Sequence, residues 1–283
     1  MRRLLLCTDL DRTLIPNGAQ AAAPGALALF RQLARRADVT LAYVSGRHQA
    51  LIVQAMHEFD LPQPVFAIAD VGSTIYQVSP AGWLEDAAWC AQIAPDWRDL
   101  THADLVDLLA VFPALQLQPP AQQNRHKLSY HVALTEDVHR LLRAVDVRLK
   151  EAQIQASLIW SIDEPAGLGL LDVLPARANK LQAIRFLMWQ NGFQESELVF
   201  AGDSGNDLEV LLSSIPAVLV ANADPQVKSQ AAAAKPGTLY LAQGGYLGMN
   251  GNYSAGILEG VAHYHPALDA WLRAQALTLQ GDH

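Results

Sequence analysis

Short apolar runs that stop at acidic, hydroxyl or glycine residues recur along this chain of 283 residues. Three of them occupy positions 4–10, 39–44 and 65–69, and the stretches between them, 24–37 and 50–59, carry apolar residues at helical spacing. Strands buried on both faces of a parallel sheet have continuous apolar runs of this kind. The alternation therefore predicts an α/β fold built on a doubly wound parallel sheet.

This alternation breaks near Pro80 and resumes near residue 170. The intervening sequence holds several tryptophans and prolines, two helical stretches at 97–111 and 136–152, and one strand-like run at 127–132. Strands are then expected at 170–173, 198–201 and 217–220, with a helix at 180–190. We therefore predict a core formed by residues 1–79 and 170–283, split by an inserted α/β cap domain of residues 80–169, which is a normal size for a small domain.

Composition and charge exclude several classes of protein. The net charge of −8 disfavours a nucleic-acid partner, which needs a basic surface. No apolar run approaches the roughly 18 residues of a membrane span, and the apolar run that starts at Leu4 is too short for a signal peptide. The two cysteines, Cys7 and Cys90, are expected to be reduced. A cytoplasmic protein is the expectation.

Four carboxylates follow two of the predicted strands. Asp9 and Asp11 end the first strand, and Asp203 and Asp207 lie in the glycine-containing loop GDSGND after the strand at 198–201. Ligands of open α/β sheets bind beyond the carboxyl ends of the strands, so these groups should meet there. Four acids in one place need a positive partner, and a hard divalent ion such as Mg²⁺ suits oxygen ligands and a phosphate-binding site.

Anion-binding groups occur at two further helix starts. Ser45 and Gly46 follow the strand at 39–44 and offer a hydroxyl and backbone N–H groups. Lys180 begins a predicted helix, where it could neutralise the acidic cluster and hold a phosphoryl oxygen. Alone, each has a plain structural reading, as a turn with a helix cap and as a surface lysine.

Taken in order, these residues resemble the four motifs of the haloacid-dehalogenase-like (HAD) phosphatase superfamily. The resemblance implies that Asp9 is the nucleophile, which forms an aspartyl-phosphate, and a ligand of Mg²⁺. It implies that Asp11 is the general acid and base and supplies its backbone carbonyl to the metal. A raised pKa is expected for Asp11, next to a second carboxylate.

The same resemblance assigns the remaining core residues. Ser45, Gly46 and Lys180 bind the phosphoryl group. Asp203 and Asp207 belong to the metal site, and Asn206 contacts the phosphate and helps to order the metal shell. Only 33 residues separate Asp11 from Ser45, whereas 132 lie between Arg47 and Lys180. The insertion therefore follows the third strand, as in the superfamily members whose large α/β cap acts on sugar phosphates.

A closer resemblance involves the cap. Alternation places Lys127, Ser129 and His131 on one face of the predicted strand and Leu128, Tyr130 and Val132 on the other. The segment KLSYH, together with VGS at 71–73, DVLP at 172–175, GDSGND and AGILE at 255–259, resembles the sucrose-phosphate phosphatases of bacteria and plants. The resemblance implies hydrolysis of sucrose 6-phosphate to sucrose and phosphate, with the sugar contacted by Arg47, Lys127, Ser129 and Tyr130.

The sequence departs from that family at a few positions. Arg12 stands where the family often has Asn, Thr74 where Glu is common, and the expected loop at 161–169 is longer and lacks the family's lysine. Other substrates therefore stay open: mannosylfructose phosphate, glucosylglycerol phosphate or mannosyl-3-phosphoglycerate.

Two further alternatives concern the kind of protein. One is a non-catalytic regulatory partner of a glycosyltransferase, which would be expected to lack Asp9 or Asp11; the other is a phosphotransferase, which the cap position disfavours. We expect a monomer, with the sugar-phosphate synthase of the same pathway as a candidate partner protein.

Overall fold

The computed structural model describes residues 3–98, 100–163, 166–234 and 237–281. Within them a mixed sheet has the strand order β12-β11-β10-β1-β2-β3-β4-β5. Its parallel strands are β1 (Leu4–Thr8), β2 (Val39–Val44), β3 (Phe66–Ala69), β10 (Leu198–Gly202), β11 (Ala217–Leu219) and β12 (Leu239–Leu241). Two antiparallel strands, β4 (Thr74–Ser79) and β5 (Gly82–Glu85), complete the sheet. The prediction of a largely parallel α/β sheet is confirmed.

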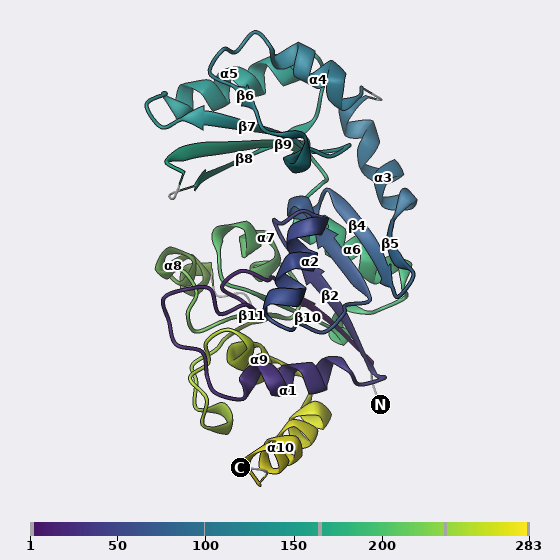
Figure 1. The fold of residues 1–283 in the computed structure, drawn as a ribbon, viewed down its shortest axis with the longest axis vertical. Coiled ribbons are helices and arrows are strands. Elements are labelled where there is room, and N and C mark those ends of the chain that lie inside the picture. The colour runs from purple at the N-terminus through teal and green to yellow at the C-terminus, as the bar shows by residue number, and fades with distance from the viewer. Residues whose placement is uncertain (1–2, 99, 164–165, 235–236, 282–283) are drawn as a thin grey trace.

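Helices flank this sheet (Figure 1). They are α1 (Ala26–Ala34), α2 (Gln49–Glu58), α6 (Lys180–Gln190), α7 (Leu208–Leu211), α8 (Pro225–Ala234), α9 (Ser254–Tyr264) and α10 (Pro266–Gly281). In α1 the side chains of Leu29, Phe30 and Leu33 are fully buried and form its apolar stripe. The helices α1, α9 and α10 pack on one another. No helix of the described chain has the length and apolar character needed to cross a membrane.

A second, antiparallel sheet lies above the first (Figure 1). Its strand order is β6-β7-β9-β8, with β6 (Gln116–Leu117), β7 (Leu128–Ala133), β8 (Ala156–Asp163) and β9 (Leu168–Pro175). The helices α4 (His102–Leu109) and α5 (Val138–Glu151) cover its upper face and share an apolar core with it. We call this sheet with α4 and α5 the cap. A further helix, α3 (Ala87–Ile93), follows β5 and packs on the core.

One predicted strand belongs to a different sheet. Residues 170–173 were expected to resume the core, but they lie in β9, which pairs with β7 and β8 in the cap. That assignment is wrong because a short apolar run does not reveal its pairing partners. The expected boundary at residue 170 therefore falls inside a cap strand, and the boundary at 79 falls before β5 of the core sheet.

The expected loop at 161–169 is also mostly strand. Residues up to Asp163 belong to β8, and those from Leu168 belong to β9, so the segment forms the end of a hairpin. Residues 164 and 165 lie outside the described part of the chain.

The order of the core strands fixes where a ligand can bind. β1 lies between β10 and β2, so the chain leaves β1 toward one side and later returns on the other. Such a reversal of strand order opens a crevice at the carboxyl ends of the strands. Asp9, Ser45 and Asp203 are the residues that directly follow β1, β2 and β10.

Candidate active site

Lys180 lies at the centre of the acidic cluster. Asn179 caps α6 through its side chain, and Lys180 is the first residue of the helix, with its own side chain buried. Its Nζ is 2.9 Å from Asp9 Oδ1, 2.8 Å from Asp207 Oδ1 and 3.1 Å from Asn206 Oδ1. Burial alone would lower the pKa of Lys180, but the carboxylates of Asp207 and Asp9 raise it above its ordinary value. The lysine is therefore a fixed positive charge.

Three carboxylates surround this part of the site. Asp9, Asp203 and Asp207 are buried, and each offers an oxygen within 4.8 Å of the others. Burial raises the pKa of Asp9, against the effect of Lys180, and burial also raises the pKa of Asp203 to about 6. Asp203 Oδ1 accepts a hydrogen bond from Thr13 Oγ1 at 3.2 Å.

The other oxygen of Asp203 is available to a ligand. Oδ2 accepts no hydrogen bond from the described residues and has only an ion pair with Arg12 Nε at 3.3 Å. A buried carboxylate oxygen without a hydrogen bond is costly. This oxygen and the neighbouring acids fit a hard divalent cation, which would favour their ionised forms.

Asp207 also shapes its own loop. Its Oδ2 accepts hydrogen bonds from the backbone N–H groups of Asp203 and Ser204, at 3.0 and 3.1 Å. Gly202 makes this close approach possible, because a Cβ there would lie 2.6 Å from the Asp207 carboxyl carbon. The acidic loop is therefore held by one of its own carboxylates.

The segment after β2 lies against the same crevice. Ser45 is buried, and its N–H donates to Ile68 of β3 at 2.8 Å. The Ser45 hydroxyl accepts from the N–H of Arg47 at 3.1 Å, which closes the turn into α2. The next residue, Gly46, lines a cavity in this crevice, which is described below.

Asp11 is paired with Arg47 rather than with the acidic cluster. Arg47 donates from Nε to Asp11 Oδ2 at 2.8 Å and from Nη2 to Oδ1 at 2.7 Å, and Asn17 adds a hydrogen bond at 2.7 Å. Burial alone would raise the pKa of Asp11, but the hydrogen bonds and charge of Arg47 bring it below its ordinary value. The raised pKa expected from the sequence is wrong for this conformation, because a guanidinium and not a carboxylate is its nearest charged neighbour.

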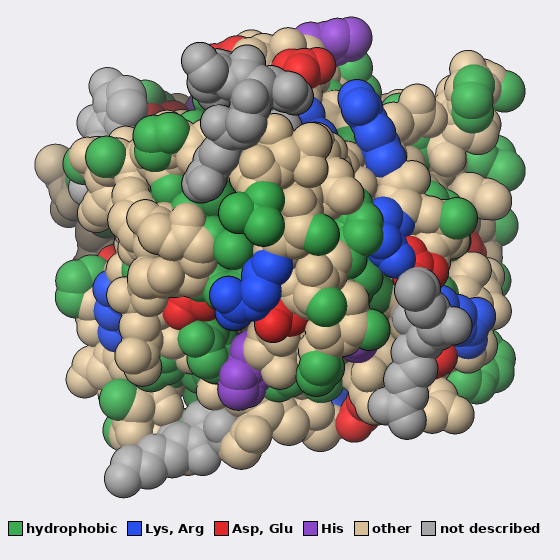
Figure 2. Space-filling view, turned by 90° about the horizontal axis from the view of Figure 1, so that it is seen from below, with side chains coloured by type: hydrophobic (Ala, Val, Ile, Leu, Met, Phe, Trp, Pro, Cys, Tyr) green, Lys and Arg blue, Asp and Glu red, His purple; other side chains and the backbone are tan. Residues whose placement is uncertain are grey.

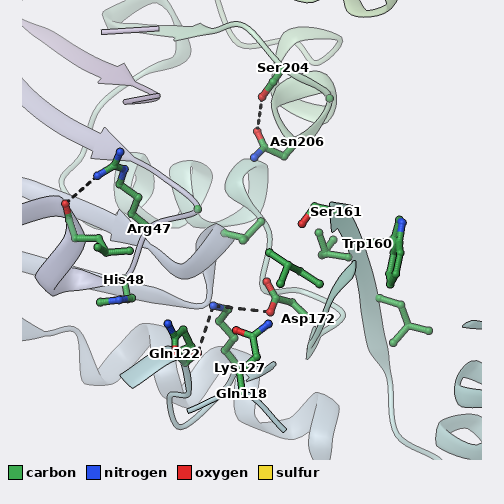
Figure 3. Close-up of a pocket in the computed structure, with 17 residues that line it drawn as sticks. Arg47, His48, Gln118, Gln122, Lys127, Trp160, Ser161, Asp172, Ser204 and Asn206 are labelled. Carbon is green, nitrogen blue, oxygen red and sulfur yellow. Dashed lines mark hydrogen bonds and ion pairs between the residues drawn. The ribbon is translucent and has the colours of Figure 1, made fainter. Parts of the chain in front are cut away.

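A cavity of about 690 Å³ separates the cap from the core. Figure 3 shows residues that line it from both sides, with Arg47 and His48 from the core and Lys127 and Asp172 from the cap. A second cavity of about 360 Å³ shares Gly46 and Arg47 with it and reaches Asp9. The two together connect the acidic cluster to the cap, where Lys127 and Asp172 stand among apolar residues such as Ile159 and Leu170.

The cap residues proposed for sugar binding do not all face this cavity. Lys127 lines it, with Nζ 3.5 Å from Asp70 Oδ1 of the core and 3.8 Å from Asp172 Oδ1 of the cap. Ser129 is fully buried behind the cavity wall. The ring of Tyr130 lies in the apolar core of the cap, and its hydroxyl is buried without a hydrogen-bond partner among the described residues.

Several residues at the site had no role assigned to them from the sequence. Thr13 and Arg12 contact Asp203, while His48, Gln118, Gln122 and Asp172 line the large cavity. Alternation along β9 could have placed Asp172 and Leu171 on different faces of the strand. Only the pairing of β9 with β7, however, brings Asp172 next to Ser129. No sequence pattern around Gln118 and Gln122 predicts that they line the cavity, because their positions depend on the path of the chain before β7.

The fold and the site define a class of protein. A mixed sheet with a cap inserted after its strand β5, and a lysine among aspartates at the carboxyl ends of the strands, is the arrangement of the HAD superfamily. The family described as sucrose-6F-phosphate phosphohydrolase matches residues 2–265, and the chain belongs to that family. It is accordingly a phosphatase, a phosphoric monoester hydrolase.

Individual relatives agree with this assignment. A protein of Nitrosococcus oceani, named only as a HAD-like hydrolase, is 52% identical over 96% of this chain and 74% of its own length. Probable sucrose-phosphatase 3a of Arabidopsis thaliana is 30% identical over 80% of the chain, which spans about half (52%) of that protein. The crystal structure of the sucrose-phosphatase of Synechocystis sp. PCC6803 with sucrose and phosphate has 30% identity and a TM-score of 0.73, and covers 93% of this chain and 98% of its own.

Proposed function

We propose that this protein hydrolyses a sugar phosphate, with sucrose 6-phosphate as its substrate and Mg²⁺ as its cofactor. The observation that carries the proposal is the contact of Lys180 with both Asp9 and Asp207 beside a cavity that reaches Asp9 and adjoins a second cavity lined by Lys127 of the cap. The cavity at Asp9 suits a phosphoryl group and a cation, and the cavity at Lys127 suits hydroxyl groups.

Asp9 is the proposed nucleophile. One of its carboxylate oxygens attacks phosphorus, the bond from phosphorus to the sugar oxygen breaks, and an acyl phosphate forms on Asp9. Lys180, held 2.9 Å from Asp9, offsets the negative charge of the incoming phosphoryl group. The residues that would hold Mg²⁺ are Asp9, Asp203 and Asp207, with the backbone carbonyl of Asp11, and the ion would neutralise phosphoryl oxygens.

Asp11 is the proposed acid and base. It donates a proton to the leaving sugar oxygen, and afterwards takes a proton from the water that attacks the phosphorus of the acyl phosphate, which releases phosphate and restores Asp9. In the conformation described here both of its oxygens are bound by Arg47. We infer that Arg47 moves away from Asp11 when the substrate enters, and that Arg47 then binds the phosphorylated sugar instead of Asp11.

The choice of sucrose 6-phosphate rests on kinship. The family and the plant and Synechocystis relatives carry names that refer to sucrose phosphate. A mannosylfructose-phosphate phosphatase of Agrobacterium fabrum is nearly as similar, at 29% identity over 80% of the chain. That substrate, glucosylglycerol phosphate and mannosyl-3-phosphoglycerate are the alternatives that the test has to separate.

Phosphate release from a panel of glycoside phosphates, with Mg²⁺ and with EDTA, tests the proposal. We expect the highest kcat/KM with sucrose 6-phosphate and no turnover with EDTA. Equal rates across the panel would contradict the assignment of sucrose 6-phosphate as the substrate but not the proposed phosphatase mechanism. Full activity in Asp9→Ala would remove both, whereas Asp107→Asn, at an exposed position of α4 in the cap, should behave as the wild type.

The proposal also covers the cellular compartment, the oligomeric state and the protein partner of the enzyme. Cys7 and Cys90 are free and buried, which is in keeping with the reducing cytoplasm. Figure 2 shows charged side chains of both signs interspersed on the face of the core away from the cap, without a basic stripe for nucleic acid. We infer a monomer whose candidate protein partner is the synthase that makes its sugar phosphate; gel filtration of the protein alone and with that synthase tests this.

A further inference from the structure

Arg12, which directly follows Asp11, is held in a left-handed backbone conformation. Its φ is 57°, in a region that residues other than Gly, Asn and Asp adopt rarely. Two amide side chains hold it there: the N–H of Arg12 donates to Asn17 Oδ1 at 2.8 Å, and its carbonyl accepts from Asn222 Nδ2 at 2.6 Å. This backbone would favour Gly or Asn, so the feature that distinguishes the position is the side chain of Arg12.

The guanidinium of Arg12 has a single contact. Its Nε lies 3.3 Å from Asp203 Oδ2, the buried oxygen that accepts no hydrogen bond from the described residues. Within the same part of the chain, the guanidinium makes no hydrogen bond and no second ion pair. The Arg12 side chain is 44% exposed and lines the cavity of about 360 Å³ beside the site. The guanidinium can therefore leave Asp203 without disturbing the apolar core.

The charge of the acidic cluster depends on this one contact. Asp9, Asp203 and Asp207 carry three negative charges when all are ionised. The buried Lys180 neutralises one of them, and Arg12 neutralises a second. With Arg12 in contact the cluster keeps one negative charge, and with Arg12 withdrawn it has two, which match a divalent cation. A guanidinium and a cation therefore compete for Asp203 Oδ2, because each repels the other there.

We propose that Arg12 is a positioning residue that neutralises and orients Asp203 in the metal-free enzyme and thereby weakens the binding of Mg²⁺. The inference rests on the proposed function, since that proposal assigns Mg²⁺ to this site. Asp203 Oδ2 passes from the guanidinium to the ion when Mg²⁺ binds, and Arg12 turns into the adjoining cavity. The arginine therefore stabilises the empty site and keeps the metal exchangeable.

Two substitutions separate the charge of Arg12 from the other effects of its side chain. Arg12→Met removes the positive charge and keeps a flexible, unbranched stem, whereas Arg12→Lys keeps the charge. Arg12→Asn is less informative, because asparagine is at ease in the left-handed conformation and would change the stability for that reason as well. Arg143→Met, at an exposed position of α5 in the cap, is the matched control.

Calorimetric titration of the EDTA-treated enzyme with Mg²⁺ tests the inference. We expect Arg12→Met to bind Mg²⁺ about tenfold more tightly than the wild type, since the repulsion between a guanidinium and a divalent ion near the protein surface is of that order. Arg12→Lys should stay within about threefold of the wild type, and Arg143→Met should not differ from it. Thermal melts give a second readout: Arg12→Met should have a lower Tm than the wild type in EDTA and the same Tm in saturating Mg²⁺.

An unchanged or weaker Mg²⁺ affinity in Arg12→Met, or an equal gain in Arg12→Lys, would overturn the inference. Hydrolysis of glycoside phosphates by the wild type separates the inference from the proposed function. If Arg12→Met binds Mg²⁺ more tightly but the wild type hydrolyses no glycoside phosphate, the inference stands and the proposed function fails. If the wild type binds Mg²⁺ and hydrolyses the sugar phosphate while Arg12→Met binds Mg²⁺ no more tightly, only the inference fails. If neither protein binds Mg²⁺, both fail.

Discussion

Arg47 binds both carboxylate oxygens of Asp11, through Nε at 2.8 Å and Nη2 at 2.7 Å. This pair keeps the pKa of Asp11 below its ordinary value, although partial burial by itself would raise it. A general acid must be protonated, so in the free enzyme only a small fraction of Asp11 is ready to act at neutral pH. The ion pair therefore bears on how activity depends on pH.

Arg47→Gln should shift that dependence to higher pH. Without the guanidinium, the pKa of Asp11 rises, and the alkaline limb of the kcat/KM profile should move up by about one pH unit, while the absolute rate falls because Arg47 is also a proposed substrate contact. The measurement is a pH series with Arg143→Gln, an exposed arginine of α5, as the control. An unmoved limb would mean that Asp11 is not the titrating group.

The affinity for Mg²⁺ should increase as the pH rises, whereas the activity on the alkaline limb decreases. Burial raises the pKa of Asp203 to about 6, so below that pH the carboxyl is protonated and has to release its proton before it can bind a cation. We expect Mg²⁺ affinity to fall by at least about tenfold for each pH unit below 6 and to level off only above about pH 8, because burial also raises the pKa of the second proposed ligand, Asp9, to about 8. Titration calorimetry between pH 5 and 8 measures this, and an affinity independent of pH would exclude Asp203 as a ligand.

Removing the buried ammonium of Lys180 should destabilise the fold. In Lys180→Met the carboxylates of Asp9 and Asp207 lose their shared partner, and an uncompensated buried charge costs about 3–5 kcal/mol of unfolding free energy. Mg²⁺ should recover part of this loss, since it supplies positive charge at the same carboxylates. Thermal melts with Mg²⁺ and with EDTA test both statements.

Lys150→Met is the matched control for that experiment. Lys150 is exposed on α5 and forms only a surface ion pair with Asp146, so its loss should change the unfolding free energy by no more than about 0.5 kcal/mol. Similar melting temperatures for the two variants would contradict the assignment of Lys180 as the neutralising charge.

The core site could be predicted from the sequence because its geometry is local. Asp9, Ser45 and Asp203 each follow a short apolar strand, and parallel strands bring their carboxyl ends to one edge of a sheet. Lys180 was expected at the start of its helix, and the structure places it there. The partner of Asp11 was not predictable, because the contact with Arg47 depends on side-chain orientation across two loops.

The cap was harder to predict because its strands are recognised only through their partners. Residues 170–173 have the same apolar pattern in a cap strand as they would in a core strand. Alternation correctly separated Ser129 from Tyr130, and the structure places Tyr130 in the cap core. The family resemblance had grouped both residues as sugar contacts, and the physical pattern already pointed to opposite faces.

Gly72→Ala should displace the start of α6, which contacts Gly72 although it lies more than 100 residues later in the chain. Gly72 has φ +105°, and a Cβ there would lie 2.4 Å from the backbone carbon of Asn179, the residue before Lys180. The clash adds to the strain of the left-handed backbone, so we expect a loss of more than about 2 kcal/mol and a clear fall in kcat. Gly82→Ala, with φ +134° and no neighbour within 4 Å, isolates the backbone effect and should cost about 1 kcal/mol without a change in kcat.

Tyr130→Phe decides between two roles for this residue. Its hydroxyl is buried in the cap core without a hydrogen-bond partner among the described residues, so removing it should leave the unfolding free energy equal or raise it by up to about 1 kcal/mol. The ring stays in place, and kcat/KM with sucrose 6-phosphate should remain within about twofold of the wild type. A loss of tenfold or more would show that Tyr130 turns toward the sugar when substrate binds.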